Sequence, residues 1–129
     1  MKLLRYATGA TFIVAGGLHF VIPSTYRAIM PPWIPRHGEA VAVSGIAEIA
    51  GGVAMFSPRT SRLGGAWLIA LLVAVFPANL HMAMNPEQIR GLADRGIPTW
   101  AFWLRLPLQP LAIALVWLVT KPTVRAGRG

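Results

Sequence analysis

Long apolar stretches alternate with short polar stretches along the chain. The apolar stretches cover Leu3–Ile22, Gly38–Phe56, Leu63–Met84 and Ala101–Thr120. Each is close to the roughly 20 mostly apolar residues that a helix needs to cross the hydrocarbon core of a bilayer. The pattern therefore predicts an all-α fold, an integral membrane four-helix bundle that forms a single domain over residues 1–129.

The connections between these stretches differ in kind. The first contains Met30-Pro31-Pro32-Trp33-Ile34-Pro35, which is apolar but too rich in proline for a regular helix. We expect this segment to lie in the membrane interface and to cap the bundle. After the third stretch, Asn85-Pro86-Glu87 looks like a helix N-cap followed by proline at the first helical position, which predicts a short surface helix reaching Gly96.

The composition favours lipid as the main solvent. Hydrophobic residues make up 55% of the chain and charged residues only 12%, about half the charged fraction of about 25% in soluble domains. The net charge is +8, but the basic residues stand at the ends of apolar stretches and not in runs. Such placement is typical of topology signals and contact with anionic lipids, and it argues against nucleic-acid binding. The absence of cysteine excludes thiolate metal sites and dithiol chemistry.

The basic residues also predict the orientation in the membrane. The side with both termini and residues 57–62 carries seven, and the other side carries four. The seven are Lys2, Arg5, Arg59, Arg62, Lys121, Arg125 and Arg128, and the four are Arg27, Arg36, Arg90 and Arg95. Because positive charge is retained on the cytoplasmic side, both termini are expected in the cytoplasm.

Glu48 is the only ionisable side chain between Val41 and Phe56. A charged group at the bilayer centre costs at least about 2.5–3.5 kcal/mol on insertion scales, so it needs a partner or a task. Ser44, Gly45, Gly51 and Gly52 lie three or four positions away on the same helical face, where small residues let other backbones approach. Glu48 is therefore expected to point into the bundle.

Other polar side chains accompany Glu48 in the outer half of the bundle. At about 1.5 Å per helical residue, three of them lie roughly one turn below the outer face, and a fourth lies about two turns below it. The predicted ligand-binding cluster is His19, Glu48, Asn79, Arg105 and Gln109. It predicts a pocket that opens outward or sideways, with walls formed by Phe20, Trp100, Phe102 and Trp103.

Several interpretations of this cluster remain open. Glu48 either holds helices together through hydrogen bonds to Asn79 or Gln109, or contacts a ligand and handles protons. Arg105 either extends to interfacial phosphates, pairs with Glu48, or binds an anionic ligand. His81 points about 200° around the helix from Asn79, which argues against a metal site, and no metal is expected. No hydrolytic motif is visible, so the catalytic residues are unknown and enzymatic activity is undecided.

Short blocks spread over nearly the whole chain resemble the DoxX-like family. These blocks are Gly16-Gly17-Leu18-His19-Phe20, Met30-Pro31-Pro32-Trp33-Ile34-Pro35, Ser44-Gly45-Ile46-Ala47-Glu48-Ile49-Ala50-Gly51-Gly52, Pro77-Ala78-Asn79 and Arg105-Leu106-Pro107-Leu108-Gln109. The resemblance implies a multi-pass four-helix protein of the cell inner membrane. Members of that family are tied to membrane redox complexes, including a thiosulfate:quinone oxidoreductase.

Two functions are expected. The first is an accessory subunit or assembly factor that supports a membrane oxidoreductase or another membrane protein, as the small size and the resemblance suggest. The alternative is a protein that binds a quinone or another lipid-like ligand in the outer-half pocket, with a proton-coupled redox role whose electrons come from a partner. Neither function requires an intrinsic cofactor. The protein is expected to be surrounded by the lipid bilayer. The sequence is compatible with an oligomer.

Overall fold

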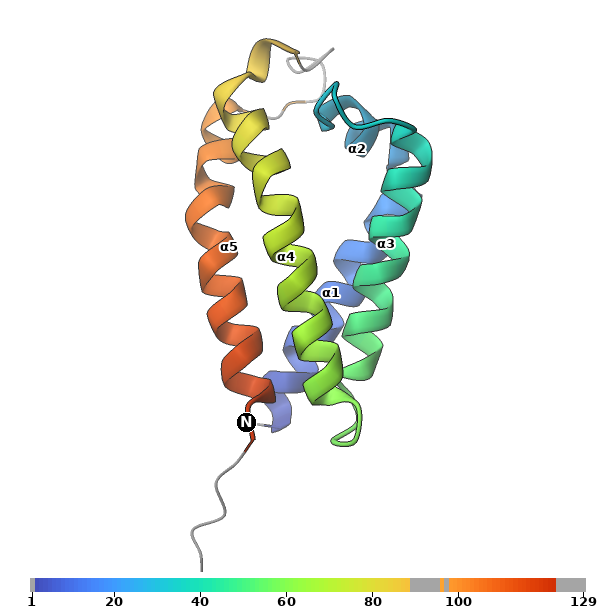
Figure 1. The fold of residues 1–129 in the computed structure, drawn as a ribbon, viewed down its shortest axis with the longest axis vertical. Helices are drawn as coiled ribbons and strands as arrows, with labels where there is room; N and C mark the ends of the chain where they lie inside the picture. Colours follow the sequence, from blue (N-terminus) through green and yellow to red (C-terminus); the bar gives the residue numbers. More distant parts are fainter. Residues whose placement is uncertain (1, 89–95, 97, 123–129) are drawn as a thin grey trace, which may run out of the picture.

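A computed structural model describes residues 2–88, 96 and 98–122, and these residues form helices and turns without any strand. Four long helices build an elongated bundle, and a short helix lies across one end (Figure 1). The elements are α1 (Lys2–Val21), α2 (Pro23–Ile29), α3 (His37–Ala54), α4 (Ser61–Met84), the 3-10 helix η1 (Pro86–Gln88) and α5 (Thr99–Thr120). The predicted all-α fold is therefore confirmed for the described residues.

The four long helices begin and end within two residues of the predicted apolar stretches. Two of them, α4 and α5, are long and apolar enough to cross a membrane. The other two are more polar, because α1 begins with Lys2 and Arg5, and α3 contains Glu39 and Glu48. Length and composition thus identify two candidate membrane spans among the described helices.

α1 and α3 pack with their backbones in direct contact at two pairs of glycines. A Cβ atom on Gly16 would lie 2.6 Å from the carbonyl oxygen of Gly45, and one on Gly9 would lie 2.7 Å from that of Gly52. Real Cβ atoms do not come this close to a backbone oxygen, so only glycine allows the observed spacing. The predicted small-residue face of α3 does permit close approach, but to two helices: Gly45 and Gly52 lie against α1, whereas Gly51 lies against Leu68 of α4.

Apolar clusters join the helices at two levels. At the end of the bundle that holds the N-terminus, buried Met55, Leu68 and Val116 connect α3, α4 and α5. Near α2, buried Met82 and Phe102 connect α4 and α5. Between these levels the interior contains the polar residues that the sequence singled out.

The proline-rich connection between α2 and α3 closes the end of the bundle, as predicted. Pro31 is fully buried, and the Nε2 atom of His37 donates a hydrogen bond to its carbonyl oxygen (3.2 Å). Trp33 remains 60% exposed and meets the ring of His81 edge to face. The connection therefore presents a buried proline to the interior and a tryptophan to the surroundings.

The segment after α4 differs from its prediction. The Nδ2 atom of Asn85 donates to the carbonyl oxygen of His81 (3.0 Å), so Asn85 closes the end of α4 and does not cap a following helix. Asparagine competes well for backbone groups at helix ends, which explains the different role. The 3-10 helix Pro86–Gln88 follows, and the remainder of the predicted surface helix, residues 89–95, lies outside the described residues.

Neighbouring glycines of α1 provide a test of the backbone contact. We expect Gly16→Ala to lower the free energy of unfolding by about 1–3 kcal/mol, because the added methyl group pushes α1 away from α3. Gly17→Ala should leave it unchanged or slightly higher, since a Cβ atom there has no atom within 4 Å. Denaturant unfolding in one detergent, followed by tryptophan fluorescence, measures both. Equal effects of the two substitutions would contradict the assigned packing.

Candidate functional site

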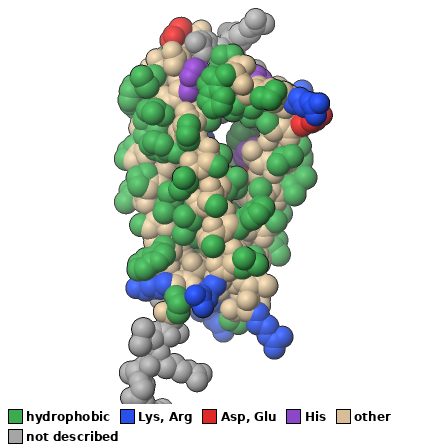
Figure 2. All heavy atoms as spheres, in the orientation of Figure 1, with side chains coloured by type: hydrophobic (Ala, Val, Ile, Leu, Met, Phe, Trp, Pro, Cys, Tyr) green, Lys and Arg blue, Asp and Glu red, His purple; other side chains and the backbone are tan. Residues whose placement is uncertain are grey.

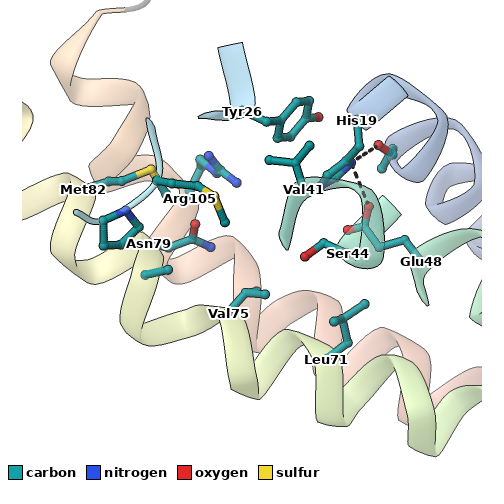
Figure 3. A pocket seen from close by; sticks show the side chains of 14 residues that line it. His19, Tyr26, Val41, Ser44, Glu48, Leu71, Val75, Asn79, Met82 and Arg105 are labelled. Atoms are coloured by element: carbon teal, nitrogen blue, oxygen red, sulfur yellow. Dashed lines mark hydrogen bonds and ion pairs between the residues drawn. The ribbon is translucent and has the colours of Figure 1, made fainter. Parts of the chain in front are cut away.

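A pocket of about 210 Å³ lies among the helices in the half of the bundle nearer α2 (Figure 3). All four long helices, α2 and the proline-rich connection contribute to it. In the same half, Figure 2 shows the surface hollowed between α4 and α3, with a histidine at the hollow. The lining residues are Ala15, His19, Tyr26, Met30, Pro31, Val41, Ser44, Glu48, Leu71, Val75, Ala78, Asn79, Met82 and Arg105.

Four of the five polar residues predicted to form a cluster line this pocket: His19, Glu48, Asn79 and Arg105. The fifth, Gln109, does not. It is buried between α5 and α4, where its Nε2 atom donates to the carbonyl oxygen of Leu72 (3.3 Å). Its Oε1 atom is buried without a hydrogen-bond partner among the described residues. Gln109 therefore joins two helices and is not a pocket residue.

His19 and Glu48 meet where α1 and α3 touch. The Cβ atom of His19 is among the atoms nearest to the position that a Cβ atom on Gly45 would occupy, so the glycine contact brings the two side chains together. The Nδ1 atom of His19 lies 3.4 Å from the Oε2 atom of Glu48. The side chains are only 11% and 20% exposed, respectively. This pair forms one wall of the pocket.

The hydrogen bond that His19 makes leaves the Oε2 atom of Glu48 without a donor among the described residues. The Nδ1 atom of His19 also lies 2.9 Å from the carbonyl oxygen of Ala15, one turn earlier in α1. A carbonyl oxygen only accepts, so Nδ1 must carry the proton and donate it there. The Oε2 atom of Glu48 is buried and has no hydrogen-bond partner among the described residues. An acceptor of this kind is costly to bury.

Arg105 and Asn79 form the opposite wall, reaching the pocket from α5 and α4 (Figure 3). Within the described part of the chain, no hydrogen bond joins Glu48 to Asn79 or Gln109, and no ion pair joins it to Arg105. Arg105 does turn inward to the pocket, as one interpretation expected, but it does not contact Glu48. The polar groups converge on the pocket but remain apart across it.

Two further polar residues line the pocket, and the sequence pattern did not indicate them. The ring of Tyr26 stacks on that of His19, with centroids 3.9 Å apart and planes 19° apart. Burial raises the pKa of the Tyr26 phenol, the charge of Glu48 raises it further and Arg105 lowers it, so the hydroxyl remains neutral. Ser44 lies one turn before Glu48 on α3. The sequence feature that could have indicated Tyr26 is Pro23, which begins α2 and lets the chain turn back towards His19.

The predicted aromatic walls are wrong. Phe20, Trp100, Phe102 and Trp103 are all absent from the lining. Trp100 and Trp103 are 64% and 53% exposed, whereas Phe102 is packed in the apolar cluster near α2. The reason is helical phase, since α5 directs only Arg105 to the pocket while the aromatic residues around it face elsewhere. Aliphatic side chains of α3 and α4 supply the walls instead.

The described residues contain no group of three or more His, Asp or Glu side chains placed to hold a metal ion. His19 and Glu48 supply only two side chains that could bind a metal ion. Arg105 on the opposite wall repels cations. The arrangement is suited to a molecule that accepts hydrogen bonds at one end and donates them at the other.

The family model described as "Domain of unknown function (DUF8561)" matches residues 8–120, which include every residue of the pocket. No curated protein and no solved structure matches the chain. The resemblance to the DoxX-like family stays a prediction.

The position of the proton on His19 can be measured directly. We expect the ¹⁵N resonances of His19 in detergent micelles to show a protonated Nδ1, because that atom faces the carbonyl oxygen of Ala15. Loss of the signals in His19→Asn assigns them, and His37 and His81 serve as internal references. A neutral ring protonated only at Nε2 would contradict the assigned geometry.

Proposed function

The chain belongs to the DUF8561 family, whose description assigns no function, and we propose that it is a multi-pass inner-membrane protein that binds an amphipathic ligand in its pocket. The ligand is a quinone or another lipid-like molecule. The observation that carries the proposal is the buried Oε2 atom of Glu48, which lacks a hydrogen-bond partner among the described residues, in a pocket that Arg105 lines from another helix.

The outer surface of the bundle supports a location in the membrane. Only 22% of the most apolar stretch of α4, and the same share of α5, is buried inside the protein. Large apolar side chains are exposed on all four long helices, for example Val14 (64%), Ile46 (60%), Val73 (57%) and Leu111 (63%). Figure 2 shows such side chains over the length of the visible face. Exposed apolar surface on this scale needs a cover, and lipid provides it on every side of a bundle.

The charges at the ends of the bundle support the orientation. The end with the N-terminus and the α3–α4 turn has five described basic residues, Lys2, Arg5, Arg59, Arg62 and Lys121, and no acidic one. Among the described residues at the α2 end, Glu39 and Glu87 balance Arg27 and Arg36. By the positive-inside rule, the first end faces the cytoplasm, and the pocket then lies in the outer half of the membrane.

The size of the pocket indicates which part of a ligand it accommodates. Pockets for drug-sized molecules measure about 300–1,000 Å³, and this one measures about 210 Å³. It has room for a polar head group, and an apolar tail would remain outside. The surface hollow between α4 and α3 faces the side that lipid would cover, so such a tail could stay in the bilayer (Figure 2).

A role as accessory subunit or assembly factor for a membrane oxidoreductase or another membrane protein stays a prediction. It is compatible with the pocket, because the described residues suggest no electron carrier of their own. If the bound molecule is a quinone, a partner would supply the electrons and Glu48 would be placed to exchange a proton with it.

The chain contains no cysteine, so single substitutions can report the topology. Pro35→Cys and Pro58→Cys place thiols at two exposed prolines in turns at opposite ends of the bundle. In intact cells, a membrane-impermeant maleimide should label the cysteine at position 35 and not that at position 58, which should react only after lysis. Labelling of both from the outside would contradict the proposed spans.

Gentle extraction followed by native mass spectrometry tests the pocket. We expect a small molecule in about equal amount with the wild-type protein, and its loss in Glu48→Leu, which removes the carboxyl group from the wall. Gln109→Leu is the matched control, since Gln109 lies at another intramembrane position outside the pocket. Retention of the molecule by Glu48→Leu, or its absence from the wild type, would contradict the proposed function.

A further inference from the structure

Two side chains of opposite formal charge face the same cavity from opposite walls without contacting each other. Glu48 belongs to α3 and Arg105 to α5, and no ion pair joins them. By contrast, Arg36 and Glu39 form an ion pair at the surface, where both are more than 70% exposed. Partners that are available to each other in a low-dielectric interior would be expected to pair, because water screens them little there. Their separation leaves room in the cavity for a group that contacts both side chains.

The wall at Glu48 needs a donor, and a positively charged one suits it best. The Nδ1 atom of His19 lies 3.4 Å from Oε2 of Glu48, but its proton is directed to the carbonyl oxygen of Ala15. The hydroxyl of Ser44 lies on the same helix one turn away. An ammonium group would supply both the missing hydrogen bond and the missing charge.

The wall at Arg105 needs an acceptor. A guanidinium group has five N–H donors and no acceptor. No described residue accepts a hydrogen bond from the guanidinium group of Arg105. Asn79 adds a further amide donor beside it (Figure 3). Arginine binds phosphate and carboxylate groups through two parallel hydrogen bonds, so an anionic group suits this wall.

We propose that the pocket selects a zwitterionic lipid head group, with a primary ammonium at Glu48 and a phosphate at Arg105 and Asn79. The inference rests on the proposed function and adds the identity of the head group. The pocket contributes one formal positive and one formal negative charge on opposite walls, so a head group with one of each places an opposite charge directly against both. Phosphatidylethanolamine has this pattern, with the two groups linked by a short chain.

A hydroquinone fits less well. Its hydroxyl groups can donate to Glu48 and accept from Arg105, but they place no opposite charge in direct contact with either side chain. A phosphatidylcholine head group carries the charges but has no N–H to donate, so it cannot form the hydrogen bond at Glu48. These differences make the head group testable with molecules of nearly the same size.

The test uses the full chain in detergent, freed of native lipid, with native mass spectrometry to titrate short-chain lipids. Dihexanoyl phosphatidylethanolamine should bind about tenfold more tightly than dihexanoyl phosphatidylcholine, the difference expected for one charge-assisted hydrogen bond. Glu48→Leu should abolish this preference, because leucine has no acceptor for the ammonium group. Arg105→Gln should weaken both lipids, and Arg105→Lys should restore part of the binding. Gln109→Leu should behave as wild type.

Equal binding of the two lipids by the wild type, or a preference that persists in Glu48→Leu, would overturn the inference. So would equally tight binding of soluble glycerophosphoethanolamine, which would make a free solute the ligand. Thermal unfolding of each variant shows that it remains folded. If a native molecule is retained and lost in Glu48→Leu while ethanolamine gives no preference, only the head-group assignment fails. If nothing is retained and no lipid binds, the proposed function fails with it.

Discussion

The direct backbone contact between α1 and α3 is the constraint on which the site depends. Because Gly16 and Gly45 have no side chains, the two helices approach until His19 lies against Glu48. A larger residue at either position would move the imidazole away from the carboxyl group. The contact also ties α1 to α3 along their length. α4 joins the end of α3 that lies farther from the pocket, through Leu68 and Met55. The pocket occupies the space that this arrangement leaves near α2.

Burying polar side chains in the interior costs folding free energy. A buried acceptor without a partner costs about 1–3 kcal/mol, and the Oε2 atom of Glu48 is such an acceptor. Hydrogen bonds to Asn79 or Gln109 would have removed that cost, but Asn79 lies on the far wall and Gln109 is bonded to α4. The proposed ligand, by donating to Glu48, would remove that cost. In this view the cluster serves recognition, and the glycine and leucine contacts serve packing.

The sequence predicts the helices well, because hydrophobic length determines them, and a fixed rise per residue places most of the polar residues at one level of the bundle. It predicts less well which residues share a pocket. Gln109 lies one turn from Arg105 on the same face of α5, and four residues of spacing give no sign that their surroundings differ. Arg105 faces α4 where the pocket opens, whereas Gln109 faces it where the two helices touch at Leu72. Where helices separate depends on the packing of all of them.

Tyr26 shows the same limit for the connections. Its position in the pocket depends on how the chain turns at Pro23 and on the stacking of its ring against His19. Aromatic residues near helix ends are also common as interfacial anchors, so residue type alone does not distinguish the two positions. The aromatic walls expected from α5 fail for the corresponding reason, since they required a helical phase that the packing of Phe102 against Met82 excludes.

The central claim is that Glu48 and Arg105 are held apart by a bound molecule. The most direct test is an experimental structure of the protein in a lipid nanodisc, with density resolved between the two side chains. The account predicts a molecule in the cavity that contacts both walls, with the carboxyl and guanidinium groups still separated. A collapsed cavity in which Arg105 pairs directly with Glu48 would contradict it.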